Sequence, residues 1–321
     1  MKTQQLREKL CRISDEILKP GDFHDKLAPA ITDYVALLSQ IVKIDSDDEQ
    51  NRKHIQSEMG QAIGTFWAAQ CVKEILRTQR FARSLFSAIK EKLNQKSGPV
   101  QVIYAGTGPF AALALPVMMH FTPAEVQFTL LEINQQTYDV LLKVLDAFNL
   151  NAYIAKCEVA DATIYQVENK NIDIVLSETM SRALIKEPQV AIMLNFARQL
   201  PSDTIFIPEE INVGLSTQHK SGTEPKLIKR LMEFNTSLRQ KLVDDTIDFN
   251  WQFDEVAIKT ELEEGESLFF STEIKVYEAN FLGFNDCSLN LLERVKTDKL
   301  DPKNLKFRYA LKETPGFMVY N

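Results

Sequence analysis

The chain has few cysteines, no excess of positive charge and no long apolar segment. Its four cysteines are scattered and form no CxxC pair, so neither a zinc site nor a disulfide framework is indicated. The formal net charge of -7 argues against a nucleic-acid partner, since phosphate recognition needs clustered lysine and arginine. These absences are typical of a cytoplasmic protein that does not bind nucleic acid.

Signals for membrane targeting are also missing from the sequence. Residues 1–19 are charged throughout and lack the apolar core of a signal peptide. No window approaches the roughly 20 apolar residues of a membrane span. The longest apolar stretch, residues 110–121, is interrupted by Pro116 and His120, and it is interpreted as a buried helix. We therefore expect no membrane partner.

The overall composition is that of an ordinary globular protein. The 321 residues are 45% hydrophobic and 25% charged, which is enough for a sizeable core and about two domains. The acidic balance favours a cationic substrate over an anionic one, because the field of the whole surface attracts the opposite charge.

The order of the sequence patterns predicts an α/β protein in three parts. Residues 1–95 carry helical periodicity, including residues 66–89, which are predicted to form one helix. Residues 96–213 alternate apolar strands with helices, as in a Rossmann-like core. Residues 214–321 contain short strand-like runs and one amphipathic helix, predicted over residues 226–242, and form a mostly β C-terminal domain.

A glycine turn and an acid indicate a cofactor that contains adenosine. Gly106 and Gly108 follow the first strand of the core, where they let a ligand approach backbone N–H groups. Glu132 ends the next strand, where an acid can accept hydrogen bonds from both ribose hydroxyls. Phe110 stands where a dinucleotide fold has its third glycine, so NAD and an oxidoreductase are less favoured. Asp161 ends a third strand and either meets an adenine ring or is a loop acid without a ligand.

Two further acids indicate the substrate. The apolar run of residues 172–176 ends at Glu178, which therefore lies at the carboxyl edge of the sheet, where α/β proteins bind ligands. Glu187 follows nine residues later, just before Pro188, which is expected to begin a helix. The loop between them can turn both carboxylates into one pocket. Two close carboxylates suit a planar cation with several N–H donors, such as a guanidinium.

These motifs resemble those of class I S-adenosylmethionine-dependent methyltransferases, and in particular of the protein arginine methyltransferase family. Three features carry the resemblance, over roughly residues 59–213. The first is Ser177-Glu178-Thr179-Met180 with Glu187, which is similar to the double-glutamate loop of the family. The second is Glu74 followed by Arg77-Thr78, and the third is the glycine turn with Glu132.

The resemblance implies S-adenosyl-L-methionine as the cofactor and assigns roles to named residues. Arg77, which composition alone describes as a solvated charge, would pair with the carboxylate of the cofactor. Glu178 and Glu187 would hold the substrate guanidinium, and Met180 would pack near the methyl group or fill the core. The cofactor-binding residues that it implies are Arg77, Ala105, Gly106, Gly108, Glu132, Asp161, Ala162 and Glu178. It also implies a possible homodimer, with the helix at residues 226–242 as a candidate dimerisation arm.

The sequence departs from the family at several points. Tyr104 stands where an acid usually precedes the glycine turn, and the Thr-His-Trp loop of the C-terminal part is missing. The expected function is N-methylation of a guanidino group in arginine, a peptide or a small guanidine. The alternatives are methylation of another small-molecule or peptide nucleophile, and a non-catalytic protein that binds S-adenosylmethionine.

Overall fold

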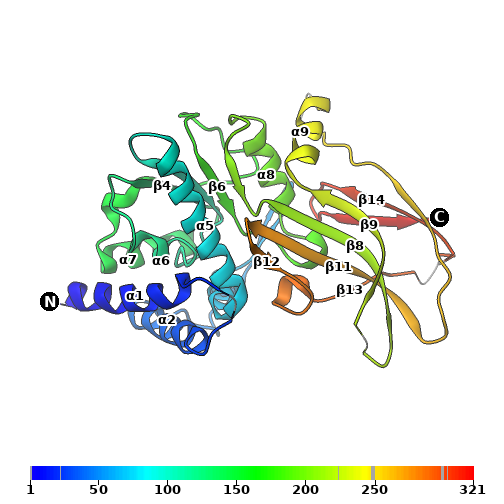
Figure 1. Cartoon of the computed structure of the whole chain (residues 1–321), viewed down its shortest axis with the longest axis horizontal. Coiled ribbons are helices and arrows are strands. Elements are labelled where there is room, and N and C mark those ends of the chain that lie inside the picture. The colour runs from blue at the N-terminus through cyan, green and yellow to red at the C-terminus, as the bar shows by residue number, and fades with distance from the viewer. Residues whose placement is uncertain (1, 22, 223, 247–249, 298–299, 302) are drawn as a thin grey trace.

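The computed structural model describes residues 2–21, 23–222, 224–246, 250–297, 300–301 and 303–321. Figure 1 shows the N-terminal helices and the helix-covered sheet beside each other in one half of the long axis, and the C-terminal strands in the other half. The predicted fold class is confirmed, because the central sheet is parallel and the C-terminal region is mostly β.

The central sheet has five parallel strands in the order β5-β4-β3-β6-β7. Its strands have the following bounds: β3 Val100–Ala105, β4 Val126–Glu132, β5 Ile154–Val159, β6 Ile174–Ser177 and β7 Ile205–Ile207. Every residue of β6 is buried, as expected for a strand covered on both faces. The chain order reverses between β3 and β6, so the carboxyl ends of these two strands form a switch point where ligands bind in such sheets.

Helices cover both faces of this sheet. They are α5 Ile75–Gln95, α6 Leu115–Met118, α7 Gln135–Phe148 and α8 Gln189–Ala197. The longest, α5, contacts β3, β6 and β7 and also reaches the C-terminal strands. Its apolar residues Phe81, Leu85, Ala88 and Ile89 recur at helical spacing and are fully buried. These residues pack α5 against the core, so the position and direction of its first turn are fixed.

Two N-terminal helices, α1 Lys2–Leu18 and α2 Leu27–Ile41, pack against each other and against α5 and α7. The Tyr34 hydroxyl of α2 donates to the carbonyl of Ala112 at 2.9 Å, just beyond the glycine turn. A short helix, α3 Glu49–Arg52, and a hairpin of β1 Ile55–Ser57 and β2 Gly60–Ala62 follow. The N-terminal helices therefore brace the loop that follows β3.

The C-terminal region contains two antiparallel sheets. The first joins β8 Glu210–His219, β9 Lys226–Phe234, β11 Glu266–Tyr277 and β12 Asn280–Leu282, with β13 Glu293–Arg294 beside β11. The second joins β10 Val256–Lys259, β14 Asn304–Ala310 and β15 Gly316–Tyr320. Burial alternates along most of β11, so one face of the strand points into the core. The helical insertion is α9 Thr236–Asp245.

Several predicted elements differ from the structure. The helix predicted at residues 66–89 is broken into α4 Thr65–Gln70, the 3-10 turn η1 Cys71–Lys73 and α5. The helix predicted at residues 110–121 is mostly turns, with only α6 helical. Residues 226–234 form β9 and not the first half of a helix, because they pair with the long strand β8. The hairpin of β1 and β2 was not expected at all.

Candidate active site

A cavity of about 440 Å³ opens at the carboxyl ends of the parallel strands, at the switch point between β3 and β6. Most of the residues predicted for the site line it: Arg77, Gly106, Gly108, Glu132, Asp161, Ala162, Glu178, Met180 and Glu187. Ala105 is not among the lining residues; it is buried at the end of β3, one residue before the cavity begins. The cavity thus brings together residues from the N-terminal, central and C-terminal parts of the chain.

The glycine turn allows the backbone to pass close to the cavity. Gly106 and Gly108 have φ values of 73° and 61°, which residues with a side chain rarely adopt. A Cβ atom on Gly106 would lie 2.1 Å from Cγ2 of Thr179, the residue after Glu178. The glycine turn is therefore in direct contact with the segment that follows β6. No larger residue fits at Gly106 unless Thr179 moves.

Glu132 is buried at the end of β4 and lines the same cavity. Its two oxygens accept backbone hydrogen bonds from Gly108 at 3.0 Å and from Asn134 at 2.9 Å. Burial raises the pKa of Glu132 to about 7, although these two donors oppose the shift. The carboxylate is held in one orientation, and each oxygen retains lone pairs for further donors.

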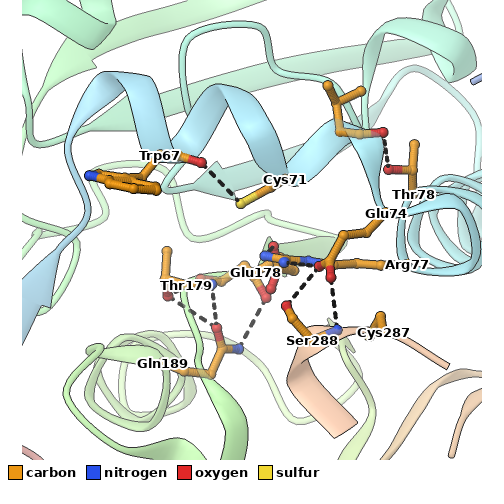
Figure 2. A network of polar contacts seen from close by, with 12 residues as sticks. Trp67, Cys71, Glu74, Arg77, Thr78, Glu178, Thr179, Gln189, Cys287 and Ser288 are labelled. Atoms are coloured by element: carbon orange, nitrogen blue, oxygen red, sulfur yellow. Dashed lines mark hydrogen bonds and ion pairs between the residues drawn. The ribbon is translucent and has the colours of Figure 1, made fainter. Parts of the chain in front are cut away.

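Arg77 lies in the first turn of α5 with its guanidinium between two carboxylates (Figure 2). Nη1 donates to Glu74 at 2.5 Å, and Nη2 donates to Glu178. The side chain is only 8% exposed, so it is not the solvated charge that its residue type suggests. Because a guanidinium has five N–H donors, these two bonds leave others available to a ligand in the cavity.

Glu178 follows β6, and a buried glutamine fixes the backbone around it. The Gln189 side chain accepts from the Thr179 amide at 2.9 Å and donates to the Ser177 carbonyl at 3.0 Å, as Figure 2 shows. One oxygen of Glu178 pairs with Arg77; the other, Oε1, is buried without a hydrogen-bond partner among the described residues. Burial raises the pKa of Glu178 to about 6, although Arg77 lowers it.

The loop from Glu178 to Glu187 turns sharply before α8. Ala183, Leu184 and Lys186 have positive φ, which is uncommon for residues other than glycine and is maintained only by surrounding contacts. The contacts come from both sides of the loop. In the C-terminal region, the Thr272 hydroxyl accepts from the Ala183 amide, the Tyr309 hydroxyl donates to the Leu184 carbonyl, and the Pro315 carbonyl accepts from the Lys186 amide. In the hairpin, the Gln61 amide donates to the Lys186 carbonyl.

These contacts place Glu187 in the same cavity as Glu178. Burial and the charge of Glu178 raise the pKa of Glu187 to about 7, although Arg77 opposes the shift. Each carboxylate therefore favours a cationic guest beside it. Pro188 precedes the first residue of α8, close to its predicted position at the helix start.

The remaining predicted residues are near the cavity wall. Met180 is buried and belongs to the hydrophobic core as well as to the lining, so its position agrees with both of its predicted roles. One oxygen of Asp161 accepts from the amide and hydroxyl of Thr163, at 2.9 and 2.7 Å. Asp161 is half-buried, and Ala162 beside it is buried. The roles of all three remain predictions.

Some lining residues were not identified from the sequence. The hairpin contributes Ser57 and Ala62, and the C-terminal region contributes Ser288. Gly60, the first residue of β2, was a usable turn signal, since its φ is 144° and a Cβ there would lie 2.9 Å from the Pro188 nitrogen. Ser288 had no comparable signal, because it reaches the site from a loop 214 positions away from Glu74.

No protein-family model matches the chain, and no curated protein matches its sequence. Several solved structures are similar to it. A chain of the Trypanosoma brucei PRMT1 enzyme-prozyme complex with AdoHcy is 13% identical with a TM-score of 0.44, covering 74% of this chain and 85% of that one. Arabidopsis thaliana protein arginine methyltransferase 10 is 11% identical with a TM-score of 0.45, covering 71% and 84%. PRMT6 is 10% identical with a TM-score of 0.47, covering 75% and 96%.

No described helix has the length and apolar character that a bilayer crossing requires. No group of three or more His, Cys, Asp or Glu side chains among the described residues is arranged to hold a metal ion.

Proposed function

We propose that the chain is an S-adenosylmethionine-dependent N-methyltransferase that acts on a guanidino group. The observation that carries the proposal is the pair of acids in one cavity at the carboxyl edge of the sheet. Glu178 has a buried oxygen without a hydrogen-bond partner among the described residues, and Glu187 is close enough for the charge of Glu178 to raise its pKa. A buried acceptor of this kind is costly unless a ligand supplies a donor. A guanidinium supplies several donors in one plane.

The residues of the cavity fit the cofactor. Glu132 holds two carboxylate oxygens where a ribose can donate to them, and the glycine turn exposes backbone at the same edge. Arg77 has N–H groups left for the carboxylate of the methionine portion. When bound, S-adenosylmethionine would supply an electrophilic methyl group on its sulfonium.

The contribution of the protein would be alignment. Glu178 and Glu187 would each accept hydrogen bonds from the guanidinium, which fixes its plane and turns one nitrogen toward the methyl group. Localising positive charge between two carboxylates leaves lone-pair density on that nitrogen. Orientation of two reactants in this way can supply several orders of magnitude in rate. Gln189 would keep Glu178 in place, because it bonds the backbone on both sides of that residue.

The proposal is tested with Glu178→Gln and Glu187→Gln, measured for transfer of a labelled methyl group to arginine peptides and small guanidines. Each glutamine keeps the shape and removes the charge, so we expect turnover to fall about 10²-fold or more. Glu264→Gln, at an exposed position in the loop before β11, is the matched control and should retain full activity.

Binding of S-adenosylhomocysteine, measured by calorimetry on the same samples, separates the possible outcomes. Retained binding with lost transfer would support the acid pair as the substrate site. Full activity in both variants would contradict it and would favour a different nucleophile. Binding without transfer by the wild type to any acceptor would favour the non-catalytic alternative.

A further inference from the structure

A serine of the C-terminal region reaches the first turn of α5. Ser288 begins the 3-10 turn η4, Ser288–Asn290, and donates twice to Glu74: its amide to Oε1 at 2.8 Å and its hydroxyl to Oε2 at 2.9 Å. Glu74 Oε2 also accepts the bond from Arg77. Figure 2 shows the resulting chain of contacts, from Ser288 through Glu74 to the guanidinium.

The side chain of Glu74 does not cap the helix, so its contact with Ser288 has another role. Glu74 occupies the N-cap position of α5, yet its side chain makes no capping bond to the helix. Side chains at this position usually accept from the first free N–H groups of the helix. Here the carboxylate turns outward to Ser288 and Arg77. Although burial alone would raise the pKa of Glu74, Arg77 and Ser288 lower it below its ordinary value, so the carboxylate is charged.

Arg77 has a second carboxylate within reach, that of Glu178, and this explains why Glu74 has to be fixed. The same guanidinium also bonds Glu178, which has a second oxygen without a partner among the described residues. If Glu74 were free to rotate, Arg77 could move fully onto Glu178, and its remaining N–H groups would no longer face the cavity. Two donors from one residue prevent that rotation, because they hold both oxygens of Glu74 at once.

We propose that Ser288 is a positioning residue for cofactor binding: by fixing Glu74 it sets the direction of Arg77, so the C-terminal region helps to form the cofactor site. The inference rests on the proposed function, since it takes the ligand of Arg77 to be the carboxylate of S-adenosylmethionine. It also gives the loop of residues 287–290 a role in the site.

A graded set of variants tests the proposal. Ser288→Thr keeps both donors, Ser288→Ala removes the hydroxyl, and Ser288→Pro removes the hydroxyl and the amide donor. Cys287 before it is extended, with φ of -158° and ψ of 179°, which is the region that a residue before proline prefers. Ser267→Ala, on β11 and away from the cavity lining, is the matched control.

We expect the dissociation constant of S-adenosylhomocysteine, measured by calorimetry, to rise in the order of donors removed. The rise should be about threefold to tenfold for Ser288→Ala and larger for Ser288→Pro, while Ser288→Thr and Ser267→Ala stay near the wild-type value. In a Glu74→Ala background, Ser288→Ala should have no further effect, because the residue through which it acts is gone. In turnover, KM for S-adenosylmethionine should rise with little change in kcat.

The experiment distinguishes failure of this proposal from failure of the proposed function. If the wild type binds S-adenosylhomocysteine and all Ser288 variants bind it equally well, the positioning role is wrong and the proposed function stands. If Ser288→Ala has the same effect with and without Glu74, Ser288 acts by another route and the proposal is also wrong. If the wild type does not bind S-adenosylhomocysteine, both are overturned.

Discussion

Replacing Glu187 by glutamine should stabilise the ligand-free protein at high pH and not at low pH. In the folded protein the pKa of Glu187 is about 7, against an ordinary value of 4.5, because partial burial and the neighbouring charge of Glu178 both raise it. Between these two values the folded protein keeps a proton that the unfolded chain releases. Stability is therefore lost as pH rises from about 4.5 to about 7, and it stays low above that range. A neutral glutamine removes this loss.

The size of the effect follows from the shift. A difference of about 2.5 pKa units corresponds to roughly 3 kcal/mol at 1.36 kcal/mol per unit. Glu187 is half-buried in the structure, so solvent screening reduces the expected gain to about 1–2 kcal/mol at pH 8. At pH 4 or below the glutamine variant and the wild type should differ little, because the carboxyl is then largely protonated in both the folded protein and the unfolded chain.

Urea unfolding of both proteins at pH 4 and pH 8, in the absence of ligands, measures this difference. Glu264→Gln serves as the control for the loss of one negative charge from the surface. The reasoning would be refuted if Glu187→Gln changed the free energy of unfolding equally at both pH values. A guanidinium guest should reverse the effect, since a neighbouring cation lowers the pKa of Glu187 and binding should then strengthen from pH 6 to pH 8.

Three further predictions concern the cofactor side of the cavity and the core. Arg77→Ala should weaken S-adenosylmethionine binding by about 1.5–3 kcal/mol, the range for a charge-assisted hydrogen bond, and an unchanged dissociation constant in calorimetry would return Arg77 to a structural role. Gly106→Ala should lower the melting temperature and the affinity for S-adenosylhomocysteine, because its Cβ meets Thr179; Gly98→Ala, at a positive φ of 88° but in open space, is the control. Leu85→Ala, at a fully buried position of α5, should destabilise by about 2–5 kcal/mol in urea unfolding without changing cofactor affinity in the protein that remains folded.

Much of the fold is predictable because local pattern and burial agree. The strand predicted to end at Glu132 is β4, which ends at that residue, and the apolar run of residues 172–176 overlaps β6. In such strands both faces are covered, so an uninterrupted apolar run is a sufficient signal. The position of Glu178 at the carboxyl edge of the sheet follows from where that run stops.

The elements that sequence reasoning missed depend on partners far away in the chain. The helix predicted over residues 66–89 breaks at Glu74, whose side chain bonds a serine of the C-terminal region. Residues 226–234 have apolar residues at spacings that fit a helix, yet they form a strand because β8 offers a long edge for pairing. Helical periodicity predicts a helix only where no such tertiary contact competes with it.

The same distinction applies to the candidate site. Residue types and spacing were enough to name the acids and the glycines that line the cavity, whereas Arg77 was named only through the family resemblance. They were not enough to show that Arg77 bonds Glu178, or that Gln189 fixes the backbone around Glu178. These bonds join residues that only the folded chain brings together, so spacing along the sequence carries no signal for them.

The most direct test of the account is transfer of a labelled methyl group from S-adenosylmethionine to a panel of guanidines, arginine peptides and non-guanidine amines, with the product identified by mass spectrometry. We predict a methylated guanidine nitrogen, formed by the wild type and lost in both Glu178→Gln and Glu187→Gln. Methylation of an amine, an oxygen or a sulfur with the guanidines untouched would contradict the assignment of the two glutamates to a guanidinium.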